Sequence, residues 1–334
     1  PTKITITSES NLTLIKSSDH ANKLSLISEH IRTPLAVNPL LKRAESATAR
    51  RRVELKKGRY LRSLLGGLMN KNHYDGVERF CVFIGYPRSG HTLIGSLLDA
   101  HPNAIIADEC NVLKYVEAGF NRQQIFYLLA QNSRLAAAAG RPREGYSYHV
   151  PDQWQGRFQK LRVIGDKMAG AFTYRMTVHP LLLERLQRLV NTEIKFIHVI
   201  RSPYDIISTL SLRTRAPLEV SVKNFFTYCG RVESIKRRLN TSAVYDLKHE
   251  EFITNPKTRL KDLCDVFNLP AHENYLDACA SIVFNSPHKS RLEAPWTPVL
   301  IDTVKQNLAK HEFLEGYSYE DRKYLRLVAV STGA

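Results

Sequence analysis

One short stretch, from residue 80 to residue 100, constrains the fold more than any other part of the chain. The apolar run Val82-Phe83-Ile84 leads into the glycine-bounded loop Gly85-Tyr-Pro-Arg-Ser-Gly90, and a helical pattern follows from Leu93 to Leu98. A strand, a tight loop and a helix start in this order present unpaired backbone N–H groups and the positive end of the helix dipole to an anion. The sequence therefore predicts a phosphate-binding loop.

The rest of the chain beyond Arg79 alternates short apolar runs with helical stretches, which is typical of β-α-β units. We predict strands at 80–86, 104–107, 162–165, 195–201 and 243–248. We predict helices at 90–100, 180–190, 203–212, 218–239, 256–267 and 298–310. The expected fold is α/β, with a central parallel sheet that carries the phosphate-binding loop (a P-loop) and helices on its flanks, over residues 76–334. An irregular insertion at 140–143 is expected on the acceptor side of the site.

The N-terminal segment, residues 1–75, is expected to be a basic, partly helical accessory segment. Nine basic residues lie between Lys42 and Arg62, and the whole chain of 334 residues carries a net charge of +16, which favours polyanionic ligands. The apolar positions of this segment predict one helix face that docks on the main domain, and contact of residues 40–68 with a membrane surface is the alternative. These positions are Leu40, Leu41, Val53, Leu61, Leu64, Leu65 and Leu68.

The cysteines and the hydropathy pattern exclude several classes of protein. The five cysteines are scattered, with no CxxC pair and no Cys/His spacing suited to zinc, so we expect a reducing, cytoplasmic location and no metal. No apolar run approaches the roughly 20 residues of a membrane-spanning helix, and the first 30 residues lack the pattern of a secretion signal. The chain begins at Pro1, so a leader or anchor removed from the N-terminus stays an open question.

The loop departs from that of nucleotide kinases at one position. The spacing of Gly85, Gly90 and Thr92 matches a kinase loop, but His91 stands where that motif requires a lysine. A kinase places that lysine on the β- and γ-phosphates, whereas Arg88 supplies a permanent cation here. The loop therefore indicates an anionic donor other than ATP, and a P-loop nucleotide kinase or NTPase is kept as an alternative.

The segment Tyr86-Pro-Arg-Ser-Gly-His-Thr-Leu93, extended by Leu97-Leu-Asp-Ala-His-Pro102, resembles the loop that binds the 5′-phosphosulfate in PAPS-dependent sulfotransferases. The tyrosylprotein and bacterial types are the most similar. The resemblance implies transfer of a sulfuryl group from PAPS (3′-phosphoadenosine 5′-phosphosulfate), with PAP as product. It implies that Arg88 stabilises the leaving oxygen, and that His91, which replaces a usual threonine, either donates to a phosphate or fills space. The residues implied to hold the 5′-phosphate are Ser89, Gly90, Thr92 and Leu93.

A second anion site is expected where the 195–201 strand ends. From the residues alone, Arg201 either binds a phosphate at the edge of the sheet or forms an ion pair with Asp205. The resemblance implies a 3′-phosphate site formed by Arg201 and Thr209, eight residues later, or by the adjacent Ser208. It also places a basic loop over the nucleotide, for which a solvated surface loop is the alternative. The residues of that loop are Lys289, Ser290 and Arg291.

Sulfuryl transfer to a hydroxyl or amine requires a base. Cytosolic members of the family carry a catalytic histidine two residues after a lysine, and Ala169 occupies that position after Lys167. In tyrosylprotein members the base is a glutamate after the second strand, which corresponds to Glu109, with Asp108 as an alternative base and helix capping as an alternative role. The resemblance gives Lys167 contact with the bridging or sulfate oxygens. Asn111 stands where an arginine for tyrosyl peptides is expected.

The acceptor and the oligomeric state are left open by these patterns. The acceptor is expected to be a small molecule, a glycan or a peptide, and no nucleic-acid partner is expected. A non-catalytic protein that binds nucleic acid or an anionic membrane through the basic segment is the alternative from another functional class.

Overall fold

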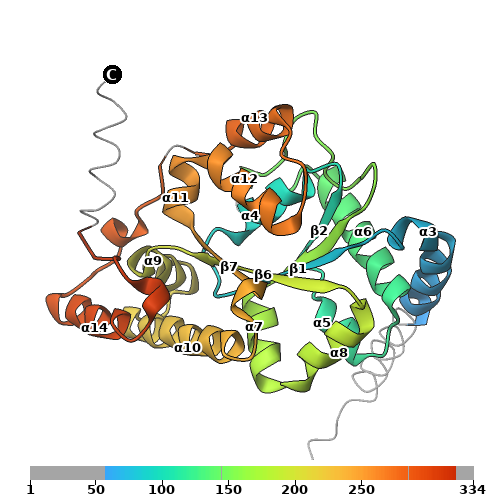
Figure 1. The fold of residues 1–334 in the computed structure, drawn as a ribbon. Helices are drawn as coiled ribbons and strands as arrows, with labels where there is room; N and C mark the ends of the chain where they lie inside the picture. Colours follow the sequence, from blue (N-terminus) through green and yellow to red (C-terminus); the bar gives the residue numbers. More distant parts are fainter. Residues whose placement is uncertain (1–56, 144, 285, 321–334) are drawn as a thin grey trace, which may run out of the picture. The chain divides into compact units, whose positions relative to one another are not determined.

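The computed structural model describes residues 57–143, 145–284 and 286–320 (Figure 1). A compact unit starts at Arg59, whereas the predictions for residues before 57 lie outside the described part. The unit is built on a parallel sheet with the strand order β2-β5-β1-β6-β7. The strands are β1 (Arg79–Ile84), β2 (Ala104–Asp108), β5 (Val163–Lys167), β6 (Glu193–Ile200) and β7 (Val244–Lys248). Each lies within two residues of a predicted strand, so the expected central sheet is confirmed.

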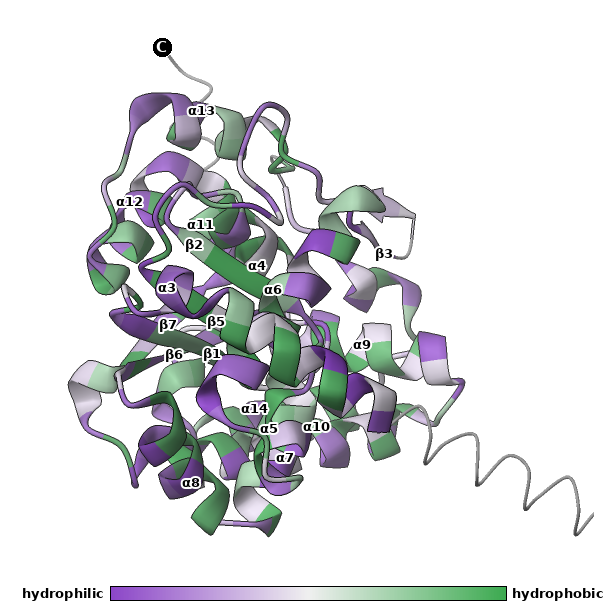
Figure 2. Ribbon diagram, turned by 90° about the vertical axis from the view of Figure 1, so that its right-hand side faces the viewer, coloured by the Kyte–Doolittle hydropathy of each residue, from purple (hydrophilic) through white to green (hydrophobic). Residues whose placement is uncertain are grey.

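Side chains of β1 alternate between two apolar cores, one on each face of the sheet. Phe80, Val82 and Ile84 pack into one core with residues of α5, α6, α7, α8 and α10, whereas Cys81 and Phe83 pack into the other with residues of α4, α11, α12 and α13. Figure 1 shows these helices above and below the sheet, and in Figure 2 the middle of the sheet has the colour of hydrophobic residues. Burial on both faces explains why the strands read as continuous apolar runs.

The helices of the two layers confirm the helical predictions where the apolar periodicity is strong. The predicted helices correspond to α4 (His91–Asp99), α8 (Leu181–Val190), α9 (Pro203–Thr214), α10 (Leu218–Lys236), α12 (Pro256–Phe267) and α14 (Pro298–Leu308). The sequence reading missed α3 (Lys71–Tyr74), α5 (Val112–Glu117), α7 (Ala169–Val178), α11 (His249–Thr254) and α13 (Glu273–Ser281), and of α6 (Arg122–Ala138) it predicted only the end, at 136–139. A capping box between Asn121 and Gln124 begins α6, and that spacing is the signal that could have identified this helix.

A buried ion pair ties together the elements around β2. Asp99, at the end of α4, pairs with Arg141 and accepts hydrogen bonds from the Ile106 N–H (2.6 Å), the Ser133 hydroxyl (2.6 Å) and the Gly156 N–H (2.9 Å). The side chains of Asp99 and Arg141 are 0% and 3% exposed. Because the carboxylate is buried, it needs this full set of partners. The cluster therefore fixes α4, which carries the phosphate-binding loop, against β2 and α6.

Residues 57–69 are helical, and this helix contacts α6 through small residues. Ser63 and Gly67 are buried, and a Cβ atom at Gly66 would lie 2.2 Å from the ring of Tyr127. The expected docking of the apolar face is wrong for Leu61, Leu65 and Leu68, because the small face allows a closer approach to α6 and turns these side chains outward, whereas Leu64 is half-buried. The exposed leucines are Leu61, Leu65 and Leu68. None of the helices in the described ranges has the length and apolarity needed to cross a membrane.

Candidate active site

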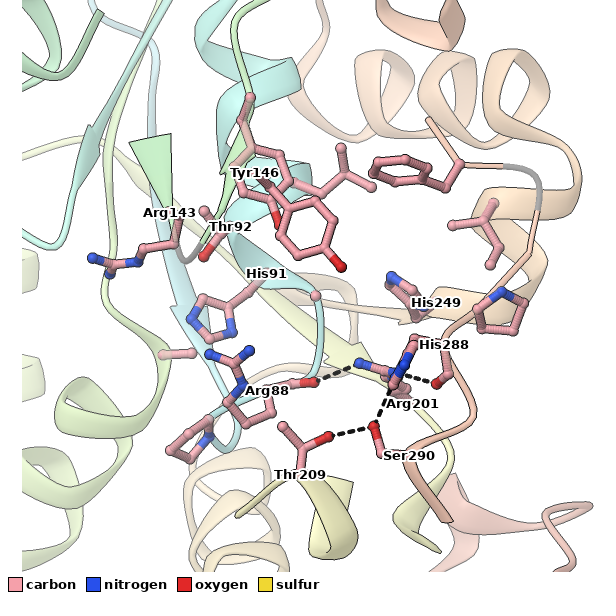
Figure 3. A pocket seen from close by; sticks show the side chains of 18 of the residues that line it. Arg88, His91, Thr92, Arg143, Tyr146, Arg201, Thr209, His249, His288 and Ser290 are labelled. Carbon is pink, nitrogen blue, oxygen red and sulfur yellow. Dashed lines mark hydrogen bonds between the residues drawn. The ribbon is translucent and has the colours of Figure 1, made fainter. Parts of the chain in front are cut away.

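A cavity of about 1210 Å³ opens at the edge of the sheet where the parallel strands end (Figure 3). Its lining comes from the loop after β1, the turn after β2, the end of β6 and the segment 286–290. These segments meet because β1 lies in the centre of the sheet, between β5 and β6. Usual ligand pockets have volumes of about 300–1000 Å³, so this cavity has room for a nucleotide together with a second substrate.

The loop between β1 and α4 forms one wall of this cavity. Arg88 and Gly90 have φ angles of 72° and 96°, and the Gly85 N–H donates to the Thr173 hydroxyl (2.8 Å). A Cβ atom at Gly90 would lie 2.2 Å from Cδ2 of His249, so only glycine lets that ring pack on the loop. The helix α4 begins directly after Gly90, so the free N–H groups of its first turn lie at the wall. The predicted 5′-phosphate residues Gly90, Thr92 and Leu93 line the cavity.

His91 lines the cavity as an uncharged ring. Burial, followed by the charge of Lys167, lowers the pKa of His91 to about 3. Its Nδ1 lies 3.1 Å from the hydroxyl oxygen of Ser89, which is itself buried. A neutral imidazole has one N–H to donate and adds no charge to the loop. Arg88, which also lines the cavity, therefore supplies the positive charge of the loop.

Lys167, at the end of β5, lies buried behind the loop. Its ammonium donates to the Thr92 hydroxyl (3.2 Å) and to the Glu109 carboxylate (3.2 Å), and it forms an ion pair with Asp108 (2.5 Å). The side chain is 2% exposed and does not line the cavity. The predicted contact of Lys167 with the donor oxygens is therefore not open in this arrangement, and Thr92 and Glu109 stand between the ammonium and the cavity.

Glu109, in the turn after β2, is a carboxylate that faces the cavity. It lines the cavity, whereas Asp108 does not. Burial would raise the pKa of Glu109, but the hydrogen bond from Arg143 and the charge of Lys167 outweigh burial and hold the pKa below its usual value of 4.5. Glu109 is therefore ionised at neutral pH and able to accept a proton. Of the two candidate bases, Glu109 has the geometry for the role.

A strained turn carries Glu109. The φ angles of Glu109 and Asn111 are 56° and 62°, a left-handed conformation that residues other than glycine adopt at a cost of about 1–3 kcal/mol each. The buried Asp166 accepts hydrogen bonds from the Cys110 N–H (3.0 Å) and the Val112 N–H (2.7 Å), which holds the turn in place. Asn111, not Glu109, occupies the N-cap position of α5, so helix capping does not explain the glutamate.

A short hairpin forms the opposite wall of the cavity. It consists of β3 (Pro142–Arg143) and β4 (Tyr146–Ser147), so the insertion predicted as irregular at 140–143 contains its first strand. Arg143 lines the cavity and forms an ion pair with Glu109. The Tyr146 ring lies 5.6 Å from the ring of Phe284, and both line the cavity. The hairpin thus adds a cation and an aromatic wall beside the carboxylate.

Arg201, at the end of β6, also faces the cavity. It donates hydrogen bonds to the backbone carbonyls of Arg88 (3.3 Å) and His288 (2.7 Å). Asp205 pairs instead with Arg291 (2.6 Å), so the alternative that Arg201 forms an ion pair with Asp205 is wrong. The guanidinium of Arg201 therefore stays available at the cavity wall.

The two hydroxyls proposed near Arg201, those of Thr209 and Ser208, have different surroundings. Thr209 lines the cavity, and its hydroxyl lies 2.9 Å from that of Ser290 (Figure 3). Ser208 is buried away from the cavity and accepts a hydrogen bond from the indole N–H of Trp296 (2.8 Å). Only Thr209 is therefore placed to meet a ligand.

The predicted basic loop lines the cavity in part. Lys289 and Ser290 are lining residues, but Arg291 is not. The side chain of Arg291 is 3% exposed, and its guanidinium binds Asp205 and the backbone carbonyl of Ser318 (3.2 Å). The guanidinium of Arg291 is therefore not open to the cavity in this arrangement, because it pairs with the buried carboxylate of Asp205.

The family model "Sulfotransferase family" matches residues 81–273, which include the loop, the turn and both strand ends described above. The chain belongs to the sulfotransferase family. It is therefore an enzyme that transfers a sulfuryl group, and use of PAPS is typical of this family.

Solved sulfotransferase structures are similar to this chain at low sequence identity. Sulfotransferase STF9 from Mycobacterium avium has 14% identity and a TM-score of 0.44, over 77% of this chain and 83% of that one. The sulfotransferase domain of the Synechococcus PCC 7002 olefin synthase has 16% identity and a TM-score of 0.40, over 78% and 96%. Mouse sulfotransferase SULT7A1, complexed with PAP, has 12% identity and a TM-score of 0.38, over 78% and 90%. No curated protein matches the chain.

The residues of the cavity in this sulfotransferase fit a nucleotide with two phosphates. Arg88 and Arg201 supply one cation each, from two different strand ends. Nε of Arg201 and Nδ1 of His249 are buried and lack a hydrogen-bond partner among the described residues, as expected where a ligand completes the set. Burial, followed by the charge of Arg201, lowers the pKa of His249 to about 3, so its ring is neutral. Within the described ranges, no group of three or more His, Cys, Asp and Glu side chains could hold a metal ion.

The roles of two residues at the site of this sulfotransferase were not predicted from the sequence. One is Asp166, which precedes Lys167 at the end of a buried strand. An acidic residue within a buried strand needs hydrogen-bond partners, and this could have indicated that Asp166 holds a neighbouring turn. Arg143 was part of the predicted insertion, but nothing in the sequence paired it with Glu109.

Proposed function

We propose that the sulfotransferase binds PAPS between the β1–α4 loop and the Arg201–Thr209 region, and passes its sulfuryl group to a hydroxyl or amine that Glu109 deprotonates. The observation that carries this proposal is one cavity lined by two arginines from separate strand ends and by an ionised carboxylate. The alternative function, a P-loop nucleotide kinase, has less support, because the neutral His91 stands in place of the lysine that a kinase needs.

Residues on the donor side bind and orient the nucleotide in this proposal. The N-terminus of α4 and Thr92 hold the 5′-phosphate, and Arg201, Thr209 and Ser290 hold the 3′-phosphate. When bound, PAPS supplies a sulfuryl group on a phosphate that serves as the leaving group. Arg88 then compensates the negative charge that gathers on the bridging oxygen as the sulfur–oxygen bond breaks and PAP keeps the electron pair.

Residues on the acceptor side move one proton. Glu109 accepts the proton of the hydroxyl or amine as the oxygen or nitrogen of the acceptor bonds to sulfur. Lys167 and Arg143 keep Glu109 ionised before this step and hold its carboxylate at the cavity. The acceptor itself is a small molecule, a glycan or a peptide with access to the wall formed by the hairpin.

Thermal unfolding with and without PAP tests the donor site. We expect PAP to raise the melting temperature of the unaltered protein, since a ligand at 100 times its Kd adds about 2.7 kcal/mol to the free energy of unfolding. Arg88→Ala and Arg201→Ala should each lose this shift, and the exposed Arg185→Ala, which is remote from the cavity lining, should keep it. Stabilisation by Mg-ATP and not by PAP would show that the donor is a different nucleotide.

Transfer of label from PAPS to a panel of phenols, alcohols, amines, glycans and peptides tests the chemistry. We expect Glu109→Gln to lower the transfer rate by about 10²–10⁴-fold, the usual contribution of a general base, while PAP still stabilises the variant. An unchanged rate would remove Glu109 as the base and leave the donor site intact as a separate result.

A further inference from the structure

The helix of residues 57–69 turns its large apolar side chains away from the protein. Leu61, Leu65, Leu68 and Met69 are 58%, 61%, 62% and 85% exposed. Their spacing along the helix places them on one face. Single exposed leucines are ordinary on a protein surface, but a continuous apolar face indicates an interaction site.

Contacts with α6 fix the rotation of this helix. The side-chain amide of Gln124 donates to the Tyr60 carbonyl (3.2 Å) and to the Ser63 hydroxyl (3.2 Å). A Cβ atom at Gly66 would lie 2.2 Å from the Tyr127 ring, and one at Gly67 would lie 2.8 Å from backbone atoms of α6. Because this side of the helix has room only for small residues, the leucines cannot rotate inward, and the packing itself presents them to the surroundings.

The charged residues of this helix and of the turn that follows it all have one sign. Arg62 and Lys71 are exposed beside it, and the sequence has no acidic residue between Glu54 and Asp75. A second copy of the chain on this face would bring like charges together, which opposes association. A surface that combines an apolar layer with negative charges, as anionic lipids do, matches both properties.

We propose that residues 59–71 form a peripheral attachment site for an anionic lipid surface. The side chains of Leu61, Leu65 and Leu68 enter the boundary between headgroups and acyl chains, and Arg62 and Lys71 contact the lipid phosphates. The helix lies along the surface, in keeping with the finding that no helix in the described part of the chain is suited to crossing a bilayer. None of these residues lines the cavity, so the site is separate from the donor site.

Co-sedimentation of the full chain with vesicles tests the attachment site. We expect binding to vesicles that contain phosphatidylserine and much weaker binding to phosphatidylcholine alone. The triple variant Leu61→Gln/Leu65→Gln/Leu68→Gln should lower the partition coefficient about tenfold or more, because each leucine contributes buried apolar area. A matched control carries Leu181→Gln and Leu292→Gln, which alter leucines that are 60% and 74% exposed elsewhere on the surface, and it should bind as the unaltered protein does.

The melting temperature and the PAP-induced shift of the triple variant should equal those of the unaltered protein, since the leucines are exposed. Three results would overturn the proposal. Equal vesicle binding by the triple variant would assign the binding to the basic residues before position 57. Absence of binding to both vesicle types would exclude a lipid partner. A dimer in sedimentation velocity that the triple variant converts to a monomer would identify a second copy of the chain as the occupant of this face.

Discussion

The left-handed glycine at the start of α4 gives the sharpest test of the donor loop. Gly90 has a φ of 96°, and a Cβ atom at this position would lie 2.2 Å from Cδ2 and 2.7 Å from Nε2 of His249. Gly90→Ala therefore introduces two separate penalties. One is the backbone conformation, which L-residues avoid, and the other is the collision with the ring.

The two penalties differ in size, and only the collision can be relieved by a second substitution. The left-handed backbone costs an alanine about 1–2 kcal/mol. Overpacking against the ring costs about 1–3 kcal/mol more, because His249 is buried and has to move. If the whole cost of about 2–5 kcal/mol opposes the loop conformation that binds nucleotide, the affinity for PAP falls by about thirtyfold or more.

Calorimetric titration of PAP into four proteins separates the penalties. These are the unaltered chain, Gly90→Ala, His249→Ala and the double variant. Removing the ring should relieve the collision and leave the backbone cost, so we expect a coupling energy of about 1–3 kcal/mol between the two sites. Full PAP affinity in Gly90→Ala, or strictly additive effects in the double variant, would refute the contact between His249 and the loop as the reason for the glycine.

Two further predictions concern the charges around the site. Arg141→Met leaves the carboxylate of Asp99 buried without its counter-ion. We therefore expect the free energy of unfolding, measured in urea, to fall by about 3–5 kcal/mol. A loss below about 1 kcal/mol would contradict the stabilising role of this ion pair. Arg143→Gln removes the charge of Arg143 and its hydrogen bond, which both lower the pKa of Glu109, so the pKa rises while Lys167 stays in place. Because the base must be ionised, the acidic limb of the kcat/KM profile should then move to higher pH, and a limb that stays in place would rule out Glu109 as the titrating group.

The sheet could be predicted from the sequence because its strands are buried on both faces and contrast with the amphipathic helices around them. The loop could be predicted because its motif is local in the sequence, with Arg88, Gly90 and Thr92 within five residues of one another. The end of α6 was predicted at 136–139, but its start was not, because the apolar periodicity of this helix is weak.

Contacts between distant residues could not be predicted in this way. Arg291 and Asp205 are 86 positions apart, and only the packing of residues 290–293 on α9 shows that the guanidinium of Arg291 pairs with the carboxylate of Asp205. The helix at 57–69 is a further example, because periodicity identifies an apolar face without saying which face docks. Gly66 and Gly67 determine which face packs on α6, since they permit a close approach that leucines would block.

The arrangement around Lys167 has a consequence for how the two substrates act on each other. The ammonium of Lys167 donates hydrogen bonds to Thr92 and Glu109 and forms an ion pair with Asp108. An oxygen of the donor that approaches this ammonium competes with these three groups for it. If the hydrogen bond to Glu109 is the one that is lost, the carboxylate loses a positive neighbour and becomes a stronger base at the moment when the donor is loaded. The lysine would then act as a relay that keeps the acceptor half of the site weakly basic until the donor half is filled.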